Sequence, residues 1–316
     1  MLFLSLSRFY NVEINISHAA YKYFLITPIV YAPLYLVYCT FWIRPKRPIR
    51  YTRERLNAAG IERLLSFFLV SFLLAAHMLA FRCIKSLIPI FHNFCWDRTF
   101  AKWDNLIHGT DPWRMIHPFL SSPFMTHLTM IFYGWYFFII MAVVAWQAAK
   151  PITDLKRNQF LLTFALCWII LGNAMAIIFS SAGPCFYHYI SPDSSRYAEL
   201  ISFLNRPTLN TDILIYSQYS LWKVYQKGEY GHLFSISAMP SMHVSITFLL
   251  VLISQKWFTK VIAWLFTIGV SLACVHLAWH YAIDIYAAIL GTYIIWLVVG
   301  MFLKDEDENV IKEPDS

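Results

Sequence analysis

Charged residues are scarce in this chain of 316 residues: they make up 14% of it, whereas 59% of the residues are hydrophobic. A soluble globular domain carries about 25% charged residues. So few polar side chains could not cover a globule of this size, which excludes soluble enzymes and soluble binding modules. Aromatic residues, at 18%, exclude a disordered chain and suit a protein that faces lipid.

Metal-binding patterns are also missing. The six cysteines form no C-x-x-C pair and none of the Cys/His spacings typical of zinc sites, so we expect no metal or other cofactor. The net charge of +7 does not indicate a nucleic-acid partner, because in a membrane protein the distribution of Lys and Arg sets orientation. The first residues lack a basic segment followed by an apolar core, and we expect no cleaved signal peptide.

Long apolar stretches are what the chain has instead. Seven are long enough to cross a bilayer, for which about 20 helical residues are needed. They cover residues 24–43, 64–81, 125–147, 160–180, 234–254, 258–277 and 283–303. They predict an all-α fold, a polytopic transmembrane helical bundle of six to seven spans. The number is six if the first stretch, which contains Pro28 and Pro33, is re-entrant.

Basic residues indicate the orientation of this bundle. They concentrate in segment 44–63 and in the connections after the third and fifth stretches. If the stretches alternate in direction, all three connections lie on one side, which should be the cytoplasm. The loops 82–124 and 181–233 then lie on the outer side, where apolar and aromatic residues at helical spacing predict interfacial helices. In the first loop these residues are Trp103, Leu106, Trp113 and Ile116.

Two histidine motifs fall on this outer side. His280 and Asp284 are four residues apart and would share one face of a helix, so the carboxylate can orient the imidazole. His276 lies one turn earlier and is expected on the same helix face, and His243 follows Pro240-Ser241 at the start of the fifth stretch. One imidazole could attack phosphorus while the other protonates the departing oxygen, which requires no metal. The first turn after Pro240 could offer backbone N–H groups to a phosphate.

Alone, the pair His280 and Asp284 also fits a buried, satisfied polar contact, and Pro240-Ser241 alone fits an ordinary helix start. A different class of function stays open as well, a non-enzymatic haem-binding or scaffold protein that uses His243, His276 or His280. A transporter is disfavoured because no inverted repeat is visible. The joint occurrence of the motifs on one side, together with Gly183-Pro184 at the end of the fourth stretch, favours catalysis.

The motifs resemble the signatures of the type 2 phosphatidic acid phosphatase superfamily of membrane phosphoesterases. Pro240-Ser241-Met242-His243 is similar to its Pro-Ser-Gly-His stretch, and residues 280–284 to its final His-xxx-Asp. Met in place of Gly and the SAGPCFY stretch, residues 181–187, look more like the branch of inositol phosphorylceramide synthases. The resemblance implies that His280 is the nucleophile, Asp284 its orienting partner and His243 the acid for the leaving group.

The phosphate-holding cations of that family are absent from their expected positions. Cys274 stands where the family has Arg, and Glu199 where it has Lys. Outer-loop candidates for the role are Arg114, Arg206, Lys223 and Lys227. The residues expected to bind substrate or phosphate are Pro240, Ser241, Gly183, Pro184, Tyr187, Arg206 and Arg114.

The sequence thus predicts N-terminal membrane spans with a basic cytoplasmic loop (1–94), a catalytic membrane domain (95–303) and an acidic cytoplasmic tail (304–316). The expected protein is a multi-pass membrane lipid phosphotransferase or phosphatase with its active site on the extracytoplasmic face. Its partners would be membrane lipids, a phospholipid or a phosphorylated sphingolipid, rather than nucleic acid.

Overall fold

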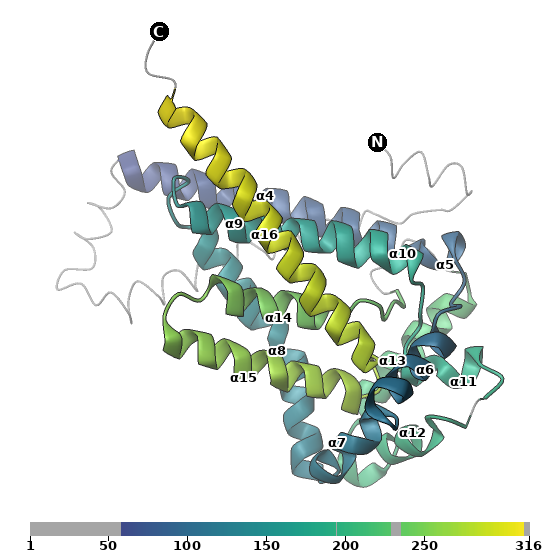
Figure 1. The fold of residues 1–316 in the computed structure, drawn as a ribbon. Helices are drawn as coiled ribbons and strands as arrows, with labels where there is room; N and C mark the ends of the chain where they lie inside the picture. The colour runs from purple at the N-terminus through teal and green to yellow at the C-terminus, as the bar shows by residue number, and fades with distance from the viewer. Residues whose placement is uncertain (1–57, 194, 229–234, 313–316) are drawn as a thin grey trace.

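The computed structural model describes residues 58–193, 195–228 and 235–312, and all regular secondary structure in these residues is helical (Figure 1). The longer helices are α4 (Ala58–Ser86), α6 (Asp97–His108), α7 (Pro112–Leu120), α8 (Pro123–Ala148), α9 (Leu155–Ile169), α13 (Asp212–Gln226), α14 (Met242–Ile253), α15 (Trp257–His276) and α16 (Ala282–Lys312). The short ones are α5 (Ile88–Phe91), π-helix η2 (Ile170–Met175), α10 (Ala176–Ile178), η3 (Pro184–Phe186), α11 (Tyr187–Ile190), α12 (Ala198–Leu204) and η4 (Pro207–Leu209).

Five stretches of helix in the described residues are long and apolar enough to cross a membrane. They are Leu65–Phe91, Pro123–Ala148, Leu155–Ile178, Trp257–His276 and Ala282–Asp305. These correspond to five of the predicted apolar stretches. The predicted stretch 24–43 and most of the basic segment 44–63 lie outside the described residues, so six to seven spans stay a prediction.

The predicted span 234–254 is too long at its start. Helix α14 begins at Met242 and has 12 residues, about 18 Å at 1.5 Å per residue, which is less than a bilayer core. Before it, the backbone N–H of Ala238 donates to Ser181 O and that of Met239 to Ser181 Oγ. These hydrogen bonds to a distant residue take the place of the helical ones, so the segment before Met242 is not helical. Pro240, which has no N–H, also favours this boundary.

Helix α14 lies in the middle of the bundle. All of its residues from Val244 to Val251 are buried, and α15, α16, α8 and α9 pack around it. Polar side chains link these helices: Ser245 Oγ lies 2.7 Å from Thr292 Oγ1, and Gln159 Nε2 donates to Trp296 O at 2.9 Å. Contacts of this kind hold helices together where hydrophobic burial gives little net preference over lipid.

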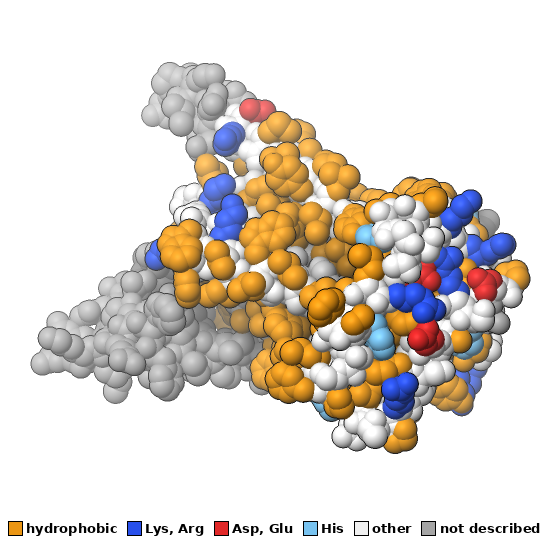
Figure 2. Space-filling view, turned by 60° about the horizontal axis from the view of Figure 1, so that its bottom comes forward, with side chains coloured by type: hydrophobic (Ala, Val, Ile, Leu, Met, Phe, Trp, Pro, Cys, Tyr) orange, Lys and Arg blue, Asp and Glu red, His pale blue; other side chains and the backbone are white. Residues whose placement is uncertain are grey.

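Helices α6, α7, α11, α12 and α13 gather at one end of the bundle, where they form a cap (Figure 1). Figure 2 shows hydrophobic side chains along the flank of the bundle and charged side chains over the cap. Trp103 and Leu106 are exposed on α6, as expected of an interfacial helix, but Trp113 is only 2% exposed. Helix α7 therefore turns its tryptophan into the cap, and the interfacial position of these helices stays a prediction.

Two local features bring side chains to the cap end. Helix α4 continues past residue 81, where the predicted span ends, and carries Arg82 and Lys85 in its last turns. The span Leu155–Ile178 changes from α- to π-helix at Ile170–Met175 before it reaches the cap. Single π-helical turns of this kind occur frequently at functional sites.

Candidate active site

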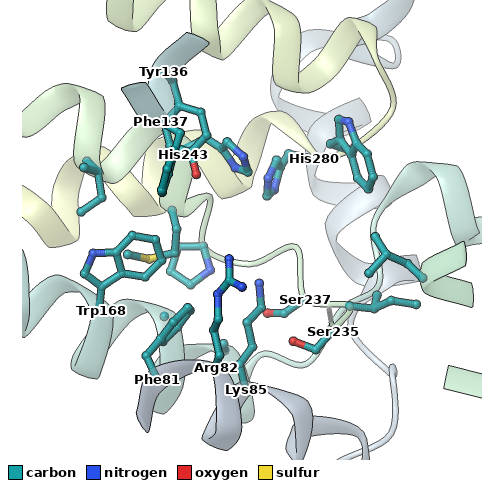
Figure 3. A pocket seen from close by; sticks show the side chains of 18 of the residues that line it. Phe81, Arg82, Lys85, Tyr136, Phe137, Trp168, Ser235, Ser237, His243 and His280 are labelled. Carbon is teal, nitrogen blue, oxygen red and sulfur yellow. The ribbon is translucent and has the colours of Figure 1, made fainter. Parts of the chain in front are cut away.

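A cavity of about 360 Å³ opens beneath the cap. Its polar lining includes His243, His280, Arg82, Lys85, Ser235 and Ser237, and its apolar lining includes Phe81, Phe137, Ile140, Met141, Trp168 and Ile246. Figure 3 shows the two histidines on one side of the space, with Arg82 and Lys85 reaching toward them from α4. The cavity therefore has a polar, cationic end near the cap and a largely apolar remainder between the helices.

His280 is held with one ring nitrogen turned away from the cavity. It lies in the turn between α15 and α16, and its Nδ1 is 2.8 Å from Ala238 O and 3.3 Å from Asp284 Oδ2. A carbonyl oxygen can only accept, so the contact with Ala238 assigns the proton of the neutral ring to Nδ1. Nε2 then carries the lone pair, which is the form a nucleophilic imidazole requires.

Asp284 sits in the first turn of α16 and is fully buried. Its Oδ2 accepts from Tyr281 N at 3.0 Å as well as facing His280. The predicted pairing of His280 with Asp284 thus occurs across the start of the helix rather than along it. The expectation that His276 shares their helix face is wrong, because α15 ends at His276.

His243 lies in the first turn of α14, facing His280. The centroids of the two imidazole rings are 5.8 Å apart, at an interplanar angle of 64°. Tyr133 stacks on the ring of His243 with centroids 4.2 Å apart, and Tyr136 lies on it at 4.4 Å. The two tyrosines of α8 therefore fix the ring of His243 within reach of a group bound at His280.

Two aspartates of α6 support the turn that carries His280. Asp104 accepts from the N–H groups of Ala282 and Ile283 at 2.8 and 2.9 Å, so it caps α16 from another helix. A negative charge is favourable at a helix N-terminus. Burial raises the pKa of Asp104 to about 6, although these two backbone hydrogen bonds lower it.

Asp97, two turns earlier on α6, holds the other side of the turn. It accepts from the N–H groups of Ala182 and Gly183 and from the Tyr281 hydroxyl, which is 2.8 Å away. Burial raises the pKa of Asp97 to about 6 against these three donors, which lower it. Sequence reasoning missed both aspartates; their only signal is a spacing of seven residues, which puts two carboxylates on one face of a helix.

Gly183 is required by the backbone at this place. Its φ of +104° is disfavoured for residues with a side chain, and a Cβ built on it would lie 2.5 Å from Trp279 O. The N–H of Cys185 donates to Ala278 O at 2.8 Å, so residues 183–185 lie directly against the turn that precedes His280. Gly183 thus supports the histidine turn from behind, and its predicted contact with substrate stays a prediction.

The predicted substrate-binding residues fall into three groups. Pro240 lines the cavity, while Ser241 lies behind it, with its Oγ 3.7 Å from Cys274 Sγ. Pro184 and Tyr187 are buried beside Ala182 and Phe186, which do line it. Arg114 and Arg206 are not among the described lining residues: Arg114 pairs with Glu199 on the exposed surface of the cap, and Arg206 lies over the Phe203 ring.

Arg82 and Lys85 line the cavity, and the sequence analysis overlooked them. Both fall in the predicted outer loop 82–124, just after the predicted span 64–81, where basic residues are common. Their spacing of three residues could have indicated a shared role, because it places both side chains on one face if the helix continues past residue 81. His276 is not among the described lining residues: its Nε2 lies 3.2 Å from Thr126 Oγ1, and its ring packs near His117 and Phe203.

Comparison with known proteins gives one finding. No curated protein and no solved structure matches the chain. A family model described as the PAP2 superfamily matches residues 98–298, which is more than half of the chain. The match includes His243, His280 and Asp284 and excludes Arg82 and Lys85. On the extent of this match, the chain belongs to the PAP2 superfamily.

Proposed function

We propose that this protein is an integral membrane enzyme that cleaves a phosphoester or phosphodiester of a lipid through a phosphohistidine and transfers the phosphorus-containing group to an acceptor. The observation that supports this most directly is the pair of imidazoles, His280 and His243, with ring centroids 5.8 Å apart on the wall of one cavity. Membership of a superfamily of lipid-phosphate phosphoesterases supports the same class of reaction.

In the first step the lone pair of His280 Nε2 attacks phosphorus, and an N–P bond forms as the bond from phosphorus to the leaving oxygen breaks. His243 gives its proton to that oxygen, so an alcohol leaves. Asp284 and Ala238 O hold the proton on Nδ1 and stabilise the positive charge that develops on the ring. The cations near the histidines attract the charged phosphate oxygens.

In the second step an acceptor hydroxyl attacks phosphorus and gives its proton to His243, which the first step left neutral. The N–P bond breaks, and its electron pair returns to Nε2. Water as the acceptor makes the protein a lipid phosphate phosphatase, whereas an alcohol makes it a transferase. The same residues serve both reactions, and the outcome depends on how well the cavity excludes water.

The lining of the cavity supports a lipid substrate. Beyond the polar end, its walls are the side chains of Phe81, Phe137, Ile140, Met141 and Trp168. These come from α4, α8 and α9, helices whose outer faces are apolar. An amphiphile fits this arrangement, with its phosphate at the histidines and a hydrocarbon chain between the helices.

Transfer to an alcohol is the version of the reaction that we favour. The motif Pro240-Ser241-Met242-His243 and the stretch 181–187 are similar to the inositol phosphorylceramide synthase branch. In the structure Met242 lines the cavity next to His243, where the glycine of the phosphatase motif would leave open space. A bulky apolar side chain beside the acid supports a site that holds a lipid acceptor and limits access of water.

We also propose that the cavity opens to the extracytoplasmic side. The basic connections after α8 and after α14 lie at the end of the bundle away from the cap (Figure 1). Basic connections favour the cytoplasm, which puts the cap outside. The domain division at residues 94 and 303 fits less well, because α4 contributes cavity-lining residues from before residue 94. We therefore place the N-terminal helix α4 in the catalytic unit.

The test uses protein purified in detergent together with His280→Ala, His243→Ala and the control His92→Ala, whose side chain is exposed. Each is incubated with phospholipids and phosphorylated sphingolipids, with and without diacylglycerol or ceramide, and phosphate and new lipids are measured by mass spectrometry. We expect loss of product in His280→Ala and a loss of about 10²- to 10⁴-fold in His243→Ala.

A synthetic ester separates the two histidine roles. With p-nitrophenyl phosphate, whose leaving group needs no protonation, His243→Ala should retain formation of an acid-labile phosphoprotein that His280→Ala lacks. If His280→Ala and wild type turn over every lipid equally, the proposal fails. The haem-binding alternative predicts instead a Soret band in the purified protein.

A further inference from the structure

The end of helix α4 supplies one wall of the cavity. Met78, Phe81, Arg82 and Lys85 all line it, and they recur at the three- and four-residue spacing of one helix face. This face changes along the helix from apolar to cationic as it approaches the cap. The two cations are half-buried, and Figure 3 shows their side chains extending into the space in front of His243 and His280.

Two basic side chains of the cap, Arg196 and Arg114, are engaged away from the cavity. Arg196 pairs with Asp111 and also donates to Ala101 O, while Arg114 pairs with Glu199 on the surface. Cys274, at the position where a phosphate-binding Arg was expected, is fully buried behind Ser241. Among the described residues that line the cavity, the cationic side chains are thus the two from α4.

We propose that Arg82 and Lys85 are the phosphate-holding cations of this site, supplied by a helix outside the family-matched segment. The proposal rests on the proposed function, because it names the groups that bind the phosphate in that reaction. An Arg guanidinium can donate to two oxygens of one phosphate, and the Lys ammonium adds a compact charge beside it. Ser235 and Ser237, on the same polar end, can donate hydroxyl hydrogen bonds to the remaining oxygens.

Arg82 and Lys85 lie at the end of a membrane-spanning helix, where burying a positive charge costs free energy of desolvation. Cations within a transmembrane segment are unfavourable unless a partner or ligand offsets their desolvation, and they mark functional sites by default. Near the end of α4 they also oppose the negative end of the helix dipole, which lowers that penalty without a ligand. A purely structural role at the helix end would affect stability but would leave the affinity for phosphate unchanged.

The variants Arg82→Gln and Lys85→Gln remove one charge each, and Lys85→Arg keeps it. Matched controls are Arg98→Gln and Lys102→Gln on the exposed face of α6. Two readouts are measured in detergent: kcat and KM for the lipid found active with wild type, and the dissociation constant of inorganic phosphate by calorimetry. His280→Ala is included because it should still bind phosphate while it lacks turnover.

We expect each Gln variant to lower kcat/KM by about 10²-fold and to weaken phosphate binding by about tenfold or more. Lys85→Arg should recover most of both, and the α6 controls should match wild type. An active wild type whose Arg82→Gln and Lys85→Gln variants, folded by circular dichroism, stay within twofold in both readouts would overturn the inference and leave the proposed function standing. A wild type without turnover that binds phosphate, and loses it in the two variants, would support the cation site while the proposed function fails.

Discussion

Replacing Asp284 with Asn should slow the reaction without abolishing it. Nδ1 of His280 has two acceptors, Ala238 O at 2.8 Å and Asp284 Oδ2 at 3.3 Å. Because a carbonyl oxygen only accepts, the shorter contact by itself keeps the proton on Nδ1 and Nε2 free for attack. The tautomer therefore survives in Asp284→Asn. What is lost is the attraction between the carboxylate and the positive charge that develops on the ring.

The size of the effect follows from that distinction. A hydrogen bond to a charged group contributes about 1.5–3 kcal/mol, and about 1.4 kcal/mol changes a rate tenfold, so kcat should fall about 10- to 150-fold. In a Ser-His-Asp triad, where the aspartate itself sets the tautomer, the same substitution lowers kcat about 10⁴-fold. The amide oxygen of Asn can still accept from Tyr281 N, so the turn should keep its shape.

The assay is the steady-state kcat of Asp284→Asn and wild type at saturating lipid, with His280→Ala as background and thermal unfolding as the control for folding. A fall of 10⁴-fold or more in a variant with the wild-type Tm would refute the role assigned to the Ala238 carbonyl. A kcat within twofold of wild type would refute charge stabilisation by the carboxylate.

Three further predictions concern the supports of the histidine turn. Asp104→Ala removes both hydrogen bonds at the start of α16 and should lower the free energy of unfolding by about 1–3 kcal/mol, measured against Lys102→Ala. Equal Tm values for the two variants would contradict the stabilisation of the α16 N-terminus by Asp104. Gly183→Ala places a Cβ 2.5 Å from Trp279 O at a φ of +104° and should cost about 1–3 kcal/mol, whereas an unchanged Tm would mean that the two backbones can separate. The raised pKa values of Asp97 and Asp104, both about 6, mean that the folded chain retains protons that the unfolded chain, with carboxyl pKa values of about 3.9, has released. The contribution of these two carboxyls to stability should therefore be fully present below about pH 4 and be lost as the pH rises through about 6. The Tm of Asp97→Asn relative to wild type should accordingly rise between about pH 4 and 7, and a relative Tm that falls over this window would refute the sign.

Apolar runs in the sequence were sufficient to locate five helices long enough to cross a membrane, whereas the side of the membrane on which the motifs lie stays a prediction. Apolar runs located the five long helices, and the charges of short connections put His243 and His280 at the same end, where their rings face each other. The boundary of α14 was not predictable from hydrophobicity, because Ser235 to Met239 are apolar enough to continue a span. Their extended path is set by hydrogen bonds to Ser181, a partner far away in the sequence.

Side chains that act across tertiary contacts were the hardest to foresee. Asp97 and Asp104 carry no local motif, and their role appears only when α6 docks on the start of α16. Arg82 and Lys85 looked like ordinary basic residues at a membrane boundary, since the sequence does not show that α4 continues to Ser86 with this face toward the histidines. Periodicity predicts which residues share a face, but not which other helix that face meets.

The two carboxylates of α6 have a consequence for how the protein is made. Asp97 and Asp104 find their partners Tyr281 and Ala282 only 184 and 178 residues later in the chain. During synthesis both acids emerge long before the last helix; Asp97 can meet the N–H groups of Ala182 and Gly183 first, whereas the donors to Asp104 come only with the start of α16. The histidine turn can therefore be completed only by a chain that has reached its final span, because a truncated copy would leave Asp104 without its two backbone donors and Asp97 without the Tyr281 hydroxyl.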